Sequence, residues 1–182
     1  MLTIKKYPDS YIQFLVHFHG DRDYFECHEV LEEYWKENTD RNKHSIWVGL
    51  IQLSVALYHH RRGNFSGAFR MIRQSKEKIL SFTDAAEHLS IDTDSLIQLI
   101  TELEGAIRTH SPYQSVMIPL TDQDLVETCR KICSDRGYSW GSTSDLQDKL
   151  LIDRHKLRDR TDIISMRQHA LISKSRSSHN KK

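Results

Sequence analysis

The sequence YFECHEVLEEYW, residues 24–35, decides the fold class, because its inward positions recur at steps of four, three and four residues. This spacing places Tyr24, His28, Leu31 and Trp35 on one face of an α-helix. After a polar turn, residues 46–58 read IWVGLIQLSVALY, and ten of these thirteen side chains are apolar. A helix that is apolar on every side is typical of the buried centre of a bundle. Together the two segments predict an all-α fold.

Helical spacing of apolar residues also occurs on both sides of this pair. We expect a compact bundle of about five core helices, followed by a looser helical C-terminal extension. Further core helices are predicted at residues 8–19, 65–79 and 93–107, and helices of the extension at 123–135 and, more weakly, at 144–158 and 162–172. The predicted domains are a helical bundle core at residues 1–110, a helical extension at 111–172 and a disordered basic tail at 173–182.

One local pattern, in residues 56–68, looks like a tetratricopeptide-type helical hairpin. Small residues at Ala56 and Ala68 allow two helices to approach closely, and Gly63 suits the tight turn between them. We find no second copy at a 34-residue period, so the sequence predicts one repeat-like hairpin inside a bundle and no solenoid.

Charge is distributed unevenly along the chain. The formal net charge is +1, but residues 1–140 carry a balance of −4 and residues 141–182 a balance of +5. A basic tail of this kind permits weak contact with nucleic acid, which we consider unlikely for the chain as a whole. The three cysteines lack CxxC spacing and suit a reducing cytoplasm, and no stretch is long and apolar enough to cross a membrane. We therefore expect a cytoplasmic protein.

Three polar side chains, His28, Glu29 and Glu32, lie on or beside the stripe of residues 24–35 that the fold must bury. Burying such groups without partners costs roughly 2–7 kcal/mol each. An antiparallel hairpin folded near residues 41–43 would supply partners from residues 46–60, with Gln52 opposite Glu32 and His59 near Phe25.

We therefore predict one polar cluster between these two helices. Its members are His28, Glu29, Glu32, Gln52 and His59, lined by Phe25, Trp35, Ala56 and Tyr58. The cluster is either a hydrogen-bonded network that fixes helix register or the lining of a pocket for a ligand, a metal ion or a partner.

A metal ion is the most specific of these ligands. His28-Glu29-x-x-Glu32 places an imidazole and a carboxylate four residues apart, with a second carboxylate beside the histidine. Spacing of this kind chelates zinc and supplies a general base. The zinc-protease motif HExxH has histidine where this chain has Glu32, so we assign neither a metal nor a cofactor from the sequence.

The two helical motifs together resemble a known protein family. Tyr24-Phe25-Glu26-x-His28-Glu29-x-Leu31-Glu32-x-x-Trp35 is followed by Gly49-Leu50-Ile51-Gln52-x-x-x-Ala56-Leu57-Tyr58-His59-x-x-x-Gly63-Asn64, in the order and at the separation seen in domain of unknown function 309. The resemblance covers residues 11–80. It implies an all-helical, cytoplasmic protein of bacteria or archaea, and it leaves the biochemical activity open.

The leading functional interpretation is a non-enzymatic protein-interaction or scaffold module in which the polar cluster is structural. The alternative is a small-ligand or metal-dependent enzyme whose site comprises His28, Glu29, Glu32, Gln52 and His59. A second alternative is weak nucleic-acid contact through the basic C-terminal tail. The oligomeric state is not predicted.

Overall fold

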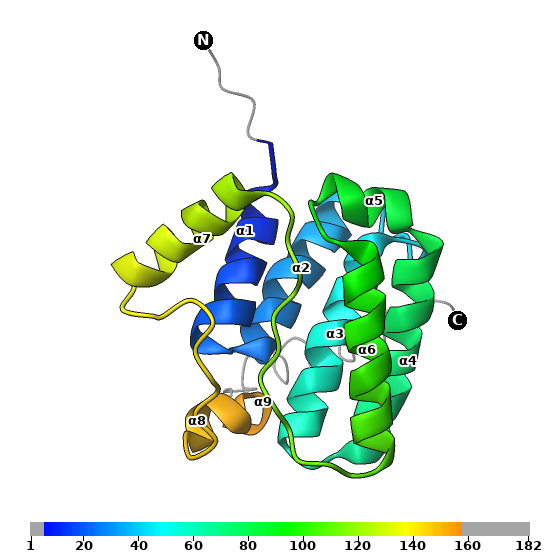
Figure 1. Cartoon of the computed structure of the whole chain (residues 1–182), viewed down its shortest axis with the longest axis vertical. Helices are drawn as coiled ribbons and strands as arrows, with labels where there is room; N and C mark the ends of the chain where they lie inside the picture. Colours follow the sequence, from blue (N-terminus) through cyan, green and yellow to red (C-terminus); the bar gives the residue numbers. More distant parts are fainter. Residues whose placement is uncertain (1–5, 158–182) are drawn as a thin grey trace, which may run out of the picture. The chain divides into compact units, whose positions relative to one another are not determined.

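The computed structural model describes residues 6–157, and these residues confirm the all-α prediction. Among them the β-type pairing is one isolated antiparallel bridge between Ile91 and Leu120. Figure 1 shows the arrangement. The elements are α1 (Asp9–Val16), a π-helical turn η1 (His17–Asp21), α2 (Tyr24–Asn38), α3 (Ile46–Arg61), α4 (Phe65–Ser81), α5 (Thr83–His88), α6 (Thr93–Arg108), α7 (Gln123–Asp135), α8 (Lys149–Ile152) and α9 (Arg154–Leu157).

The helices begin where short polar side chains can cap them. Asp23 accepts a hydrogen bond from the backbone N–H of Glu26, and Ser45 and Asn64 cap α3 and α4 in the same way. Each cap satisfies a backbone donor that the first helical turn leaves unpaired. The starts of the two helices that carry the candidate cluster are therefore fixed by local sequence.

The central helix is α3, which packs against α2 on one side and α4 on the other. The predicted hairpin is present: Gly63 makes the turn between α3 and α4 with a φ of +70°, and Ala56 and Ala68 are buried. The two helices also approach closely at Gly49, where an added Cβ would lie 3.1 Å from the Cβ of Lys78. Helix α6 also packs against α4, and Figure 1 shows it in front of α3 and α4.

Packing divides the chain into two compact units, Met1–Ile152 and Asp153–Lys182. The first unit contains α1 to α8, and α7 packs against α1 within it. The predicted boundaries at residues 110 and 172 remain predictions about which segments fold independently. The predicted helix at 162–172 and the predicted disordered tail at 173–182 lie outside the described residues.

Three details differ from the sequence-based expectation. The first helix ends at Val16 and passes into η1, which ends where Arg22 adopts a left-handed conformation with a φ of 59°. The short helix α5 was not predicted, since six residues are too few to show a periodicity. The weak helix expected at 144–158 is present as two short helices, α8 and α9. Asp148 precedes α8 and caps it through its carboxylate, and the carbonyl of Asp153, which precedes α9, accepts a hydrogen bond from the backbone N–H of Lys156.

An extended segment, residues 111–120, runs across the bundle between α6 and α7, and we call it the strap. Its backbone is held by buried polar side chains: the backbone N–H of Ile118 donates to His19 Nε2 at 2.9 Å, and Arg22 donates to the carbonyl of Val116. Among the helices described, none combines the length and apolar character required to cross a bilayer.

Candidate functional site

Three side chains of α2 form the most concentrated group of potential ligands in the described part of the chain. His28 Nδ1 lies 3.1 Å from Glu29 Oε1, and His28 Nε2 lies 3.5 Å from Glu32 Oε2. The imidazole is therefore held between two carboxylates that come from one and a half turns of the same helix. We call His28, Glu29 and Glu32 the α2 triad.

The α2 triad is accessible to solvent, which corrects the assumption that it is buried. The side chains are 29%, 32% and 32% exposed, respectively. Helix α2 turns Tyr24, Cys27 and Leu31 into the core instead. His28 follows Cys27 by one residue, about 100° around the helix, and so lies at the edge of the packed face.

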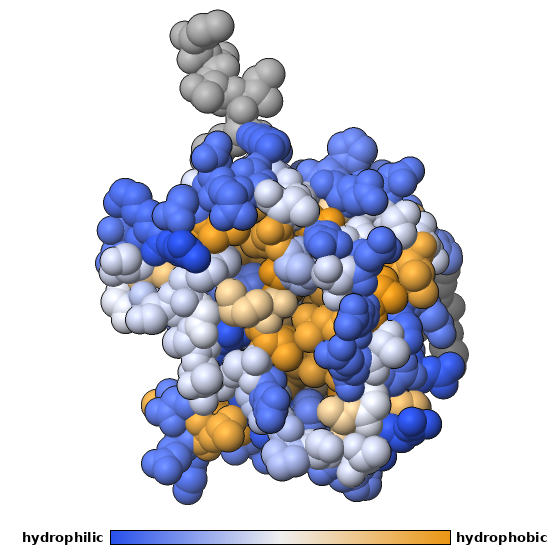
Figure 2. All heavy atoms as spheres, viewed as in Figure 1, coloured by the Kyte–Doolittle hydropathy of each residue, from blue (hydrophilic) through white to orange (hydrophobic). Residues whose placement is uncertain are grey.

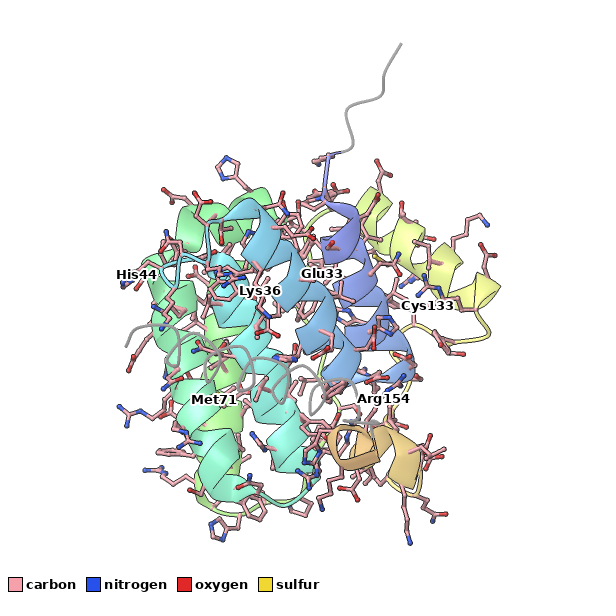
Figure 3. The ribbon with its side chains drawn as sticks, turned by 180° about the vertical axis from the view of Figure 1, so that it is seen from behind. Glu33, Lys36, His44, Met71, Cys133 and Arg154 are labelled. Atoms are coloured by element: carbon pink, nitrogen blue, oxygen red, sulfur yellow. The ribbon has the colours of Figure 1, made fainter. Side chains whose placement is uncertain are left out.

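A cation completes the group. Lys36 Nζ lies 3.1 Å from Glu32 Oε1, so the two oxygens of Glu32 face Lys36 and His28, respectively. Lys36 therefore offsets part of the negative charge that the two carboxylates bring to the α2 triad. Figure 3 shows this face of α2 from behind, with Lys36 and its exposed neighbour Glu33 labelled.

The distances in the α2 triad suit a transition-metal ion. One ligand atom from each residue lies within 4.8 Å of the other two. Two ligands at about 2.1 Å from a tetrahedral ion are roughly 3.4 Å apart, which is close to the 3.5 Å between His28 Nε2 and Glu32 Oε2. Glu29 can then act as the third ligand, or it can accept from Nδ1–H and orient the ring.

The other two residues of the predicted cluster point elsewhere. Gln52 Nε2 donates to Gln74 Oε1 of α4 at 3.1 Å, and its Oε1 is shielded from solvent without a partner among residues 6–157. The predicted hydrogen bond between Gln52 and Glu32 is therefore replaced by a contact to α4. His59 Nδ1 accepts from Asn64 Nδ2 at 3.1 Å, at the hairpin turn.

The predicted lining residues pack around the α2–α3 contact. The ring of Phe25 lies 6.2 Å from that of His28 and 6.4 Å from that of Tyr58, so Phe25 borders the α2 triad at one end and connects it to Tyr58 of α3. The indole N–H of Trp35 donates to the carbonyl of Asn42, in the turn before α3. Ala56 is fully buried in α3.

Sequence reasoning missed the buried polar residues near η1. Burial lowers the pKa of His19 to about 3, and its ring stacks on Trp140 with centroids 4.3 Å apart. Arg22 is 1% exposed and donates from its Nε to the carbonyl of Ser142, while Arg61 donates to Ser144 Oγ. These side chains hold the strap and residues 139–144 onto the bundle, and no local pattern in the sequence indicates that role.

Comparison with known proteins settles the family. Residues 11–71 match the model of a family described as domain of unknown function (DUF309), and the matched segment contains the whole α2 triad. The uncharacterized protein YpuF of Bacillus subtilis (strain 168) is 46% identical over 171 residues, which cover 94% of this chain and 98% of that protein. The chain belongs to the DUF309 family.

The DUF309 match confirms the resemblance inferred from the two helical motifs. It begins at Tyr11 in α1 and ends at Met71 in α4, so it covers α1, η1, α2, α3 and the hairpin turn but stops before α6 and α7. No solved structure matches the chain. Neither the family description nor the name YpuF assigns an activity.

Proposed function

We propose that this DUF309 protein binds a divalent transition-metal ion at the α2 triad. The observation that supports this proposal most directly is the convergence of one imidazole and two carboxylates, with ligand atoms within 4.8 Å, at a solvent-accessible position. The mixed nitrogen and oxygen set favours Zn²⁺ and similar ions over Ca²⁺, which prefers oxygen ligands alone.

Three protein ligands would leave the ion a coordination position for water. This arrangement is typical of catalytic zinc sites, whereas structural zinc sites use four protein ligands. The enzymatic alternative for His28, Glu29 and Glu32 therefore becomes the leading proposal. Gln52 and His59 are not part of it, because each is engaged away from α2.

Calorimetric titration of the full-length, untagged protein with ZnCl₂ tests the proposal. We expect one ion per chain and an affinity at least about tenfold lower in His28→Ala and in Glu32→Gln, the usual scale for weakening a metal site. Glu33→Gln is the matched control, since Glu33 is an exposed neighbour outside the triad. CaCl₂ should bind much more weakly than ZnCl₂.

Zinc that binds equally well to His28→Ala, Glu32→Gln and the wild type would contradict the proposal. The eleven histidines of the chain offer other places for adventitious zinc, which the variants distinguish. Thermal unfolding of each variant without metal shows whether a lost affinity reflects the site or a disturbed fold.

A protein-interaction role is a second candidate, supported by exposed apolar side chains before and within α8. Leu146 and Leu150 are 57% and 71% exposed and lie four residues apart, and Figure 2 shows an apolar patch at this part of the surface. Pull-downs should lose a partner with Leu146→Ser/Leu150→Ser and keep it with Leu80→Ser, a matched exposed leucine of α4. Equal recovery by both variants would contradict the role.

Two further expectations remain predictions. Weak nucleic-acid contact through residues 141–182 rests on charge alone, and most of that segment lies outside the described residues. A cytoplasmic location rests on cysteine usage and on the family resemblance.

A further inference from the structure

A cavity of about 280 Å³ opens between α6 and the strap, far along the chain from the α2 triad. Leu99, Leu103 and Ala106 of α6 form one wall, and Pro112 and Val116 of the strap form the other. Figure 2 shows apolar side chains gathered between these two elements, framed by hydrophilic ones. An apolar cavity of about 150 Å³ already accepts benzene, so this space is large enough for a small aromatic molecule.

His60 of α3 lines the same cavity and is 3% exposed. Its Nε2 lies 2.9 Å from the carbonyl oxygen of Ser111. Because a carbonyl only accepts, Nε2 carries the hydrogen, and in the neutral ring Nδ1 is left as an acceptor. Nδ1 is shielded from solvent and has no partner among the residues that the structure describes. A molecule in the cavity therefore meets another part of the His60 ring and does not reach this nitrogen.

The charge at the cavity has one sign. Glu102 contributes a carboxylate, and none of the described residues that line the cavity is a lysine or an arginine. Gln98 donates to Glu102 Oε1 at 3.1 Å, which leaves Oε2 available for a second donor. The cavity therefore offers one carboxylate, that of the exposed Glu102, beside walls that combine apolar and polar side chains.

We propose that this cavity binds a small organic cation, a protonated amine attached to a compact apolar group. The ammonium group would pair with Glu102, while the apolar group would pack between Leu103 and Val116. This site shares no residue with the α2 triad and requires no metal ion.

Titration of the full-length, ¹⁵N-labelled protein with benzylamine, followed by NMR, tests this inference. Benzyl alcohol and benzoate are matched probes that replace the ammonium by a neutral and a negative group. We expect benzylamine to shift the amides of Leu103, Ala106 and Ser111 with a roughly millimolar dissociation constant, the scale of a ligand of this size. It should bind about tenfold tighter than benzyl alcohol, and benzoate should not bind.

Two variants and a control locate the binding. Ala106→Leu fills the cavity and should abolish the shifts, whereas Thr101→Leu, on the exposed face of α6, should not. Glu102→Gln should reduce benzylamine binding to the level of benzyl alcohol.

Benzylamine that binds no more tightly than benzyl alcohol, or that binds equally well to Ala106→Leu, would overturn the proposal. Because Thr101→Leu adds the same side chain to the same helix, a loss confined to Ala106→Leu cannot be ascribed to a general disturbance of α6.

Discussion

At the scale of single residues, the buried histidine His19 makes the stability of the fold depend on pH. Burial holds its pKa near 3, whereas an unfolded histidine titrates near 6.5. Between these values the unfolded chain binds a proton that the folded protein excludes, so stability falls as the pH is lowered from about 6.5 towards 3. The expected loss is about 1.4 kcal/mol per pH unit.

Urea unfolding at several pH values between 7 and 4.5 measures this effect. His19→Gln keeps a side-chain acceptor for the backbone N–H of Ile118 but cannot titrate. The wild type should therefore lose stability more steeply than His19→Gln over this range, while carboxylates contribute equally to both. Parallel pH dependences of the two proteins would show that His19 is not the cause.

Lys36 is the residue that should limit the metal affinity of the α2 triad. It lies 3.1 Å from Glu32 Oε1, so it competes with a metal ion for the carboxylate and repels the positive charge. Lys36→Met should raise the Zn²⁺ affinity by about threefold to fivefold, the scale of a surface ion pair, and by less at high salt. An unchanged or lowered affinity in the titration would show that Lys36 does not oppose the ion.

At the scale of helices, the contact between α3 and α4 depends on a missing side chain at Gly49. An added Cβ there would lie 3.1 Å from Lys78 Cβ and 3.2 Å from Ile79 Cγ1, so Gly49→Leu should destabilise the fold by about 1–3 kcal/mol. Gly105, within α6, has no atom within 4 Å of that position, and Gly105→Ala should stabilise by about 0.5–1 kcal/mol. Thermal or urea unfolding of both variants checks the two signs; a stable Gly49→Leu would mean that the helices can separate at little cost.

The same helices show what the sequence determines and what it leaves open. Apolar spacing and capping residues locate α2, α3 and α4, and the spacing of His28, Glu29 and Glu32 alone brings the α2 triad together. Helix α3 is apolar on nearly every side, so periodicity cannot fix its rotation, and Gln52 turns towards α4. The exposure of His28 could not be predicted either. Periodicity gives the angular position of a residue around α2, but it does not show where the face that packs against the rest of the protein ends.

At the scale of the whole molecule, two buried arginines connect the helical bundle to residues 142–151. Arg22 donates to the carbonyl of Ser142 at 2.7 Å, and Arg61 donates to Ser144 Oγ at 2.8 Å and to the carbonyl of Leu151 at 3.4 Å. A chain that ends at Trp140 lacks these acceptors, so Arg22 and Arg61 each lose hydrogen bonds that their buried, charged side chains make in the full-length protein. Its thermal midpoint should fall by about 5–10 °C, because about 1 kcal/mol corresponds to 2–4 °C at this size.

A chain that ends at Ile152 is the control, since it keeps every one of these acceptors. Its midpoint should stay within about 2 °C of the full-length value. An equal fall in both shortened chains would show that the arginine contacts do not account for the loss. Nothing in the sequence predicted this connection, because Arg22 and Arg61 meet their acceptors about 80 to 120 positions away.

The central claim, that α2 carries a metal site, is tested most directly by anomalous X-ray diffraction from crystals of the full-length protein grown with Zn²⁺. Data collected on both sides of the zinc absorption edge locate the ion independently of any assumed ligand. We predict one dominant zinc peak about 2.1 Å from His28 Nε2 and from an oxygen of Glu32, with Glu29 as the third ligand or hydrogen-bonded to the ring. Zinc peaks located only at other side chains, with the α2 triad empty, would contradict the claim.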